Sequence, residues 1–331
     1  MPGMLSLHYI ESHVDVATPA LRTPLLQHYF GSHTSQREPG FYVACIQSLF
    51  DFFAALFSNA ADEGEQQKAR LPSLVVNTNG WITGTGLDCL LAIVKHVQPS
   101  HVVHCRQPEG KDMAEWTKAA IEEAAEVALQ FHSRQMDGLV DAPPRKRAAD
   151  HRERLLRNYF DVTPELPLML QNTYSVPWSH LRVCVMHHPV HPTRVLDAIN
   201  GLMGGLCIDR SPYASTVVPV TSDAPEGSWE DMPLVLQSTP IVECVGAGVI
   251  RDIDVENKLY QVITPVPMHV LQHVNTFLRG DVEIPTGVLV EGSTTDVPYL
   301  CTDSLGASDC AAALPMKKAR PTLVRQHQLS A

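Results

Sequence analysis

The chain has 331 residues, of which 44% are hydrophobic and 18% are charged, and its formal net charge is -11. This composition excludes a largely disordered chain, and the length allows two domains with cores of their own. The acidic balance excludes a uniformly basic surface, so contact with nucleic acid would need a local basic cluster. The eight cysteines are dispersed without a C-x-x-C pair, which is typical of reduced thiols in an intracellular protein.

The first 58 residues predict short strands followed by one long helix. Residues 4–10, 18–22 and 25–30 are extended pieces broken by prolines. In residues 41–57, apolar side chains recur at intervals of three and four, which predicts a helix that buries one broad face. The same run is the only candidate for a membrane span, but it is short and carries two polar residues, so we expect a buried helix and no membrane partner.

A strand, a turn and a helix are expected between residues 74 and 97. Residues 74–78 (LVVNT) predict a buried strand, the following glycines predict a turn, and residues 87–97 predict an apolar helix. The next strand, at residues 101–105, would complete a β-α-β unit of a parallel sheet.

Polar residues after the first of these strands are candidates for ligand binding. Ligands of parallel α/β sheets bind at the carboxyl ends of the strands, which is where Asn77, Thr78, Asn79 and Trp81 fall. The alternative is an ordinary strand-to-helix turn with a packed tryptophan, and the pattern alone does not choose between the two.

One basic cluster interrupts this acidic chain. Residues 113–131 are rich in alanine and glutamate and predict a solvated helix. Residues 145–157 (RKRAADHRERLLR) then combine six basic with two acidic residues, a net charge of +4. Such a run is either a solvated helix face or a phosphate clamp, because guanidinium groups match phosphate oxygens.

The helical periodicity of the sequence mostly ends near residue 163, where we place a domain boundary. Short β-like runs separated by Gly, Pro, Asp and Asn follow, which predicts a β-rich domain, with its last strand at residues 287–292. Within it, residues 268–278 predict a short helix. Residues 293–331 lack periodicity and predict a disordered basic tail.

Three clustered histidines do not predict a metal site. His187, His188 and His191 are interrupted by Pro189 and Pro192, which break the helix that would align them, and no carboxylate or thiol is suitably spaced. No metal site is therefore expected.

Glycine motifs do not identify a nucleotide site. Gly246 and Gly248 lack the third glycine and the following helix of a dinucleotide fingerprint, so bulge or turn glycines are expected. The phosphate-loop string G-x-x-x-x-G-K-[ST] does not occur in the 331 residues. On this basis the chain alone is not expected to hold a nucleoside triphosphate well.

Two stretches together resemble a known family. Residues 78–81 (TNGW) match the T-x-G-W "clasp" of the polynucleotide 5′-hydroxyl kinases, and residues 239–275 are similar to the C-terminal domain of their nucleolar branch, the pre-ribosomal RNA processing kinases. PGMLSL near the N-terminus and YFG at residues 29–31 follow the order of that family. The resemblance covers roughly residues 2–303.

The resemblance implies a fold, an activity and a location. The expected fold is α/β: a partial P-loop kinase core with its first strands missing (residues 1–162), a β-rich C-terminal domain (163–303) and a disordered tail (304–331). The family transfers the γ-phosphate of ATP, with Mg²⁺, to the 5′-hydroxyl of RNA. Pre-ribosomal RNA, a protein partner in an rRNA-processing complex and a nucleolar location are therefore expected.

Carried over residue by residue, the resemblance also names a site. Thr78, Asn79, Gly80 and Trp81 would bind the substrate, with Thr78 holding the reacting phosphate or terminal nucleotide and Trp81 against its base.

The catalytic arginines of the lid would be Arg152 and, next, Arg147, although the strict R-x-x-x-R spacing is not found. The family's phosphate loop and Walker B carboxylate would precede residue 1, so we expect a truncated kinase that is silent by itself. The alternative is a non-enzymatic interaction module of a pre-rRNA processing complex.

Overall fold

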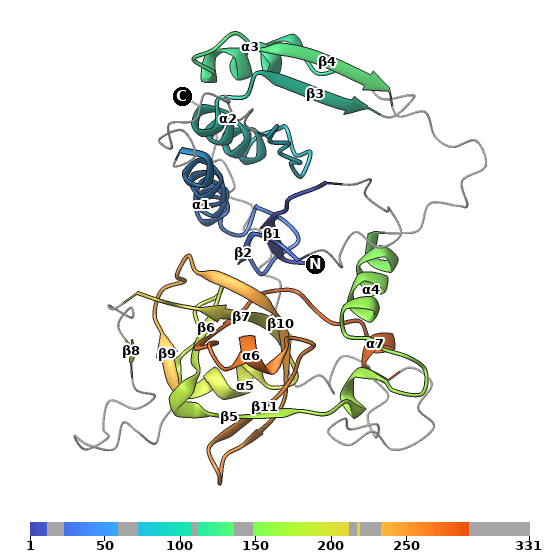
Figure 1. The fold of residues 1–331 in the computed structure, drawn as a ribbon, viewed down its shortest axis with the longest axis vertical. Coiled ribbons are helices and arrows are strands. Elements are labelled where there is room, and N and C mark those ends of the chain that lie inside the picture. Colours follow the sequence, from blue (N-terminus) through green and yellow to red (C-terminus); the bar gives the residue numbers. More distant parts are fainter. Residues whose placement is uncertain are drawn as a thin grey trace, which may run out of the picture.

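The structure, a computed structural model, describes residues 1–11, 23–58, 72–106, 112–135, 148–211, 217–218 and 233–290. Figure 1 shows an α/β part at one end, built from helices α1, α2 and α3 and the strands β3 and β4, and a large mixed sheet at the other end. The β1–β2 hairpin lies between the two parts, and α4 lies beside the large sheet.

The α/β part, with the hairpin that precedes it, contains two short N-terminal strands, three helices and one parallel pair of strands. Its elements are β1 (Met4–Leu7), β2 (Leu26–Tyr29), α1 (Pro39–Ser58), α2 (Thr85–Val97), β3 (His101–Arg106), α3 (Glu115–Ala124) and β4 (Gln130–Gln135). β1 pairs antiparallel with β2, and β3 pairs parallel with β4. The strands predicted near residues 4–10, 25–30 and 101–105 and the helices predicted at 41–57 and 87–97 are confirmed, whereas residues 18–22 lie outside the described part.

Two predictions in this part are wrong. Residues 72–80 form no strand, and Val75 is 85% exposed; no segment of the described part pairs with them through a ladder of backbone hydrogen bonds. The helix predicted over 113–131 ends at Ala124, and β4 follows, because Phe131 packs with the core around Ile121. The β-α-β unit that forms is therefore β3-α3-β4.

Helix α1 is less buried than predicted. Only Tyr42, Cys45 and Leu49 on it are buried among the residues with described side chains, and Leu56 is exposed. It packs on α2, where Asp51 accepts a 2.8 Å bond from the imidazole of His96. By length and composition, α1 is the one described helix that could cross a membrane, and one such helix is weak evidence for a span.

The second part is an eight-stranded sheet, which confirms the predicted β-rich texture. The strand order is β5-β11-β10-β7-β12-β6-β9-β8. The strands are β5 (Tyr174–Pro177), β6 (Arg182–Val185), β7 (Met203–Ile208), β8 (Val217–Val218), β9 (Leu234–Leu236), β10 (Glu243–Asp254), β11 (Leu259–Ile263) and β12 (Thr276–Arg279). β6 runs parallel to both β9 and β12, so the carboxyl ends of these three strands meet at one edge.

Short helices and α4 cover this sheet. They are α4 (Ala148–Tyr159), α5 (Val195–Ile199), α6 (Met268–Leu271), α7 (Thr286–Val290) and the 3-10 turns η3 (Leu168–Leu170), η4 (Trp178–His180) and η5 (Pro192–Arg194). Leu156 and Phe160, on and just after α4, pack in one cluster with Met203 and Val249 of the sheet. The boundary predicted near residue 163 stays a prediction, and α4 before it packs with the residues after it.

Three local expectations in this part can be compared with the structure. The strand predicted over 287–292 is wrong, because Thr286–Val290 form helix α7, in which Val288 is fully buried. The helix predicted over 268–278 is one turn, α6, followed by β12. The register between β10 and β7 shifts between Cys244 and Gly246, which confirms the predicted bulge glycine at Gly246.

The six cysteines of the described part are free thiols, five of them buried. The tail predicted over 293–331 lies outside the described residues.

Candidate functional site

A cavity of about 330 Å³ lies where four chain segments meet. It is lined by Gly3, Met4 and Leu5, by Phe30, Ser32, His33, Thr34, Ser35 and Tyr42, by Asn77, Thr78 and Asn79, and by Arg152. We call it the clasp cavity. The predicted site residues Thr78, Asn79 and Arg152 therefore line one cavity, although Arg152 is more than 70 residues away from the other two in the sequence.

The clasp residues are held by the side chain of Asn79. Its Nδ2 donates to the hydroxyl of Ser35 at 2.9 Å, and its Oδ1 accepts from the backbone N–H of Trp81 at 3.1 Å. Ser35 is only 2% exposed, so the first bond anchors an exposed segment to a buried point. Thr78 is exposed beside it, with its hydroxyl available on the cavity wall.

A hydroxyl-rich loop forms the opposite wall. The side chain of Ser32 accepts from the N–H of Thr34 at 3.4 Å, and Thr34 accepts from the N–H of Gln36 at 3.3 Å. Such local bonds hold the chain in a turn and keep several small donors on one side. The sequence pattern predicted no role for residues 32–35, and the clustering of hydroxyls directly after Gly31 is the signal that points to them.

Arg152 supplies the positive charge of the cavity. It is half-buried, and no described carboxylate forms an ion pair with it. Burial and, next, the charge of Arg152 lower the pKa of His33 below its ordinary value of 6.5, and Glu283 and Asp281 oppose this shift. Arg152 and His33 therefore lie close together and together face the cavity.

The other basic residues of α4 are engaged elsewhere. The guanidinium of Arg157 donates to Glu153 at 2.9 and 3.1 Å, one turn away on the same helix. Arg154 is exposed, and its partner at 3.3 Å is His151. Arg147 lies outside the described residues. Within the described part, Arg152 is thus the arginine of the basic block that lines the cavity.

Trp81 and Gly80 lie outside the lining of the clasp cavity. Trp81 is half-buried and packs on the first turn of α2: a Cβ added to Gly86 would lie 2.1 Å from Trp81 Cδ2. Gly80 has φ +72° and open space around it, which is the backbone geometry that a turn glycine serves. The position of Trp81 is that of the packed tryptophan considered as an alternative above.

The donor set of the clasp cavity fits phosphate oxygens. Its walls offer a guanidinium group, an imidazole and several hydroxyls, and no carboxylate is among the lining residues. Magnesium does not fit the same lining, because Mg²⁺ is held by carboxylates. Among the described residues no group of three or more His, Cys, Asp or Glu could hold a metal ion. No described residue is accordingly assigned to magnesium.

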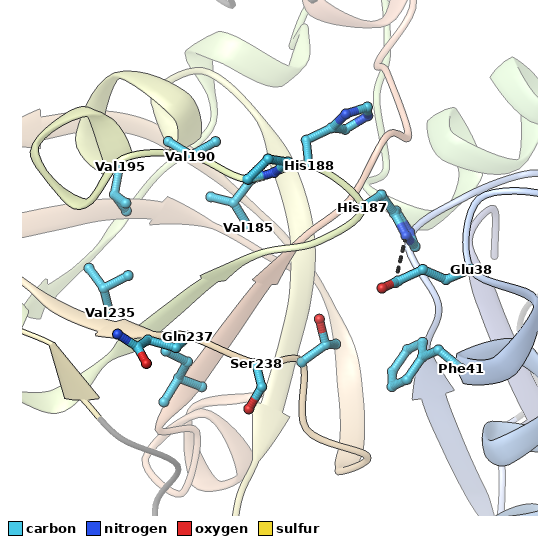
Figure 2. Close-up of a pocket in the computed structure, with 13 residues that line it drawn as sticks. Glu38, Phe41, Val185, His187, His188, Val190, Val195, Val235, Gln237 and Ser238 are labelled. Carbon is cyan, nitrogen blue, oxygen red and sulfur yellow. Dashed lines mark hydrogen bonds and ion pairs between the residues drawn. The ribbon is translucent and has the colours of Figure 1, made fainter. Parts of the chain in front are cut away.

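A second cavity, of about 760 Å³, lies at the carboxyl ends of β6 and β9. Figure 2 shows its apolar wall of Val185, Val190, Val195 and Val235, with Glu38 and Phe41 from the α/β part on the other side. No lysine or arginine lines it, so it does not resemble a phosphate site.

The three clustered histidines separate in space, and only His187 and His188 of the three line this second cavity. His187 bonds Glu38, His188 pairs with Asp281 at 3.2 Å, and His191 is exposed and bonds Thr193. Each ring is therefore engaged by a different neighbour.

Comparison with known proteins identifies both halves of the chain. A family profile described as the P-loop of the mRNA cleavage and polyadenylation factor CLP1 matches residues 1–162, and one described as the NOL9-like C-terminal domain matches residues 232–285. The polynucleotide 5′-hydroxyl-kinase NOL9 of Arabidopsis thaliana is 28% identical over 330 residues, which cover 93% of this chain and 80% of that protein. Over most of its length, this chain is thus distantly similar to the NOL9 polynucleotide 5′-hydroxyl kinases.

Other NOL9 relatives are longer. The proteins of Bos taurus and Homo sapiens with the same name are each 27% identical over 91% of this chain, which spans only 46% of their length. One solved structure, of the interface between Pcf11p and Clp1p, aligns with this chain at 11% sequence identity and a TM-score of 0.47. The alignment covers 84% of this chain and 60% of the chain in that structure.

The match of the P-loop profile changes one expectation. Because residues 1–162 match a P-loop domain, the predictions that the phosphate-loop part is missing and that the chain alone binds ATP poorly are not supported. Truncation of the kinase is likewise not shown.

Proposed function

We propose that this protein is a polynucleotide 5′-hydroxyl kinase of ribosomal RNA processing, which transfers the γ-phosphate of ATP to the 5′-hydroxyl of RNA in the nucleolus. The observation that carries the proposal is that Thr78 of the clasp and Arg152 of the basic block line one cavity with no carboxylate in its lining. The similarity to NOL9 kinases over most of the chain supports the same reaction.

On this proposal, different residues of the cavity stabilise charge, donate hydrogen bonds and fix the geometry during phosphoryl transfer. Such a transfer passes through a loose transition state with charge spread over the phosphoryl oxygens, so positioning and electrostatics supply most of the catalysis. Arg152 faces that charge, and the hydroxyls of Thr78 and of the loop at 32–35 donate to the oxygens. Asn79 keeps the two walls at a fixed separation through its bond to Ser35.

The test is a phosphorylation assay with the chain itself. Purified protein is mixed with γ-labelled ATP, Mg²⁺ and a 5′-hydroxyl oligoribonucleotide, with the 5′-phosphorylated oligonucleotide as the blank. We expect label to appear on the 5′-hydroxyl substrate only. Arg152→Ala should lower the rate roughly ten- to a hundredfold, because a charged hydrogen bond to the transferring group is lost.

Arg154→Ala is the matched control, since it removes the same charge from an exposed position on the same helix. It should leave the rate within about twofold of the unmodified protein. If the folded chain transfers no label and binds no 5′-hydroxyl RNA, the alternative of a non-enzymatic interaction module replaces the kinase.

A further inference from the structure

His187 joins the large sheet to the loop of the clasp cavity. It follows β6, at the edge where the carboxyl ends of β6, β9 and β12 meet. Its side chain is fully buried, and its φ of +65° turns the chain toward the α/β part. Nδ1 lies 2.9 Å from Glu38 Oε2, and Nε2 lies 2.8 Å from the backbone oxygen of Phe30. Figure 2 shows the imidazole pointing at Glu38 across the cavity edge.

Both partners of the ring are oxygen atoms. A backbone carbonyl oxygen cannot donate, so Nε2 of His187 donates to the oxygen of Phe30. Nδ1 lies at hydrogen-bond distance from the Glu38 carboxyl group, so one ring bridges two points of the α/β part.

The two residues that His187 contacts bracket the hydroxyl-rich loop. Phe30 lies immediately before residues 31–37, and Glu38 lies immediately after them. This loop includes Ser32 to Ser35 of the clasp cavity. Fixing both ends of a loop removes most of its freedom, so the bonds of His187 act on the cavity wall without touching its ligand.

A second contact from the sheet holds the same loop. The N–H of Asp281 donates to the backbone oxygen of Gly31 at 2.6 Å, and its carboxylate pairs with Arg37 at 3.0 Å. Gly280 makes the close approach possible, since a Cβ there would lie 2.1 Å from the Gly31 oxygen. Both tethers come from residues just beyond parallel strands of the large sheet.

We propose that His187, through its ring contacts with Phe30 and Glu38, is the positioning residue by which the large sheet holds the phosphate-facing loop at residues 31–37. The C-terminal domain is on this account part of the RNA-end site and not a separate docking module. The inference rests on the proposed function for its substrate, whereas the tether itself is a property of the folded protein.

Two measurements test the tether without any activity. In protein with ¹⁵N-labelled histidine, His187 should show a slowly exchanging ring N–H proton at Nε2, assigned by its loss in His187→Gln. In hydrogen exchange, His187→Gln should raise the exchange of amides 31–37 by roughly tenfold or more, because buried hydrogen bonds at both ends of the loop are lost. His191→Gln is the matched control, an exposed histidine of the same cluster, and should change neither signal.

The link to function is tested with a fluorescent 5′-hydroxyl oligoribonucleotide. His187→Gln should weaken its binding, or raise KM and lower kcat together, and Glu38→Gln should be milder, because the amide still forms a hydrogen bond with the ring. If His187→Gln fails to fold, the ring-proton measurement on the unmodified protein still decides. The lack of a slowly exchanging ring N–H, or unchanged amide exchange in folded His187→Gln, overturns the proposal.

The two proposals fail in different ways. If amides 31–37 lose protection but neither protein binds or phosphorylates RNA, the kinase fails and the tether holds. If RNA binding is normal in both proteins, the tether does not serve the site, and the positioning role is rejected.

Discussion

The amide of Asn79 donates a 2.9 Å hydrogen bond to the hydroxyl of Ser35, across 44 residues of sequence, and so joins the two polar walls of the clasp cavity. The same side chain fixes the backbone of Trp81 through its other end. Asn79 is thus placed to set the geometry of the clasp, although the T-x-G-W pattern does not specify the residue type at this position.

Replacement of either partner should weaken binding of the RNA end. The losses of binding free energy caused by the two replacements should not be additive. Asn79→Ala and Ser35→Ala each remove one bond, so the double variant should bind about as weakly as the worse single one, a coupling energy of about 1 kcal/mol. Affinities for a 5′-hydroxyl oligoribonucleotide measure the cycle. Strictly additive losses would assign the two side chains to independent contacts.

Asn79→Asp separates the two bonds of this residue. The carboxylate keeps an acceptor for the N–H of Trp81 but has no N–H for Ser35, and it adds negative charge beside the cavity. We expect weaker binding of RNA than for Asn79→Ala at low salt, with the difference shrinking as salt is raised. Equal affinities at all salt concentrations would count against an anion in the cavity.

Trp81 has two competing roles that one variant distinguishes. If its ring stacks on the terminal base when RNA binds, Trp81→Ala lowers binding by about 1–3 kcal/mol with little change in unfolding. If it only packs on Gly86, the loss appears in the unfolding free energy instead and RNA affinity stays unchanged. Urea unfolding and RNA titration on the same preparation give the answer. Because Trp81 packs on α2 outside the lining of the clasp cavity, we expect the loss in the unfolding free energy.

Anion binding to the clasp cavity should strengthen as the pH falls. The pKa of His33 is lowered in the free protein by burial and by Arg152, so the ring is neutral near pH 7. A bound phosphate group favours the imidazolium and raises this pKa, so binding takes up a proton. Affinity for a 5′-phosphorylated oligonucleotide should therefore rise between pH 7.5 and the lowered pKa, which lies below 6.5.

His33→Gln is the control for this dependence. The amide still donates a hydrogen bond but does not titrate, so the affinity should become flat over that pH range. A slope that persists in His33→Gln would assign the proton to another group.

Gly280→Ala should disturb both stability and the cavity. The new Cβ would lie 2.1 Å from the oxygen and 2.3 Å from the Cα of Gly31, so backbone must move, at a cost of about 1–3 kcal/mol in the free energy of unfolding. The loop of the cavity begins at Gly31, so RNA affinity should fall as well. Urea unfolding and the RNA titration measure the two effects.

Gly40→Ala is the matched control for that change. Gly40 lies in the first turn of α1 with nothing within 4 Å of an added Cβ. Alanine there should stabilise the protein by about 0.5–1 kcal/mol and leave RNA binding unchanged. A loss of stability at Gly40, or none at Gly280, would contradict the packing described here.

The sequence alone determined those features that depend on local pattern. The three-and-four spacing of apolar residues in α1 and α2 and the short runs of the large sheet are set by backbone periods, and they were predicted correctly in kind. The basic block could be singled out because guanidinium groups match phosphate oxygens, and TNGW could be singled out only by its resemblance to a family motif.

Tertiary structure decided what depends on neighbours. Residues 74–78 have the composition of a strand, but a strand exists only where another chain segment completes its hydrogen bonds, and no described segment does so here. Gln130–Gln135 lacks a strong strand pattern and became β4 because β3 lies beside it. Only packing selected Arg152 among the arginines of α4 in the described part, and only packing turned His187 toward Phe30 and Glu38. Neither choice has a local signal, because each depends on side chains more than 70 residues away in the sequence.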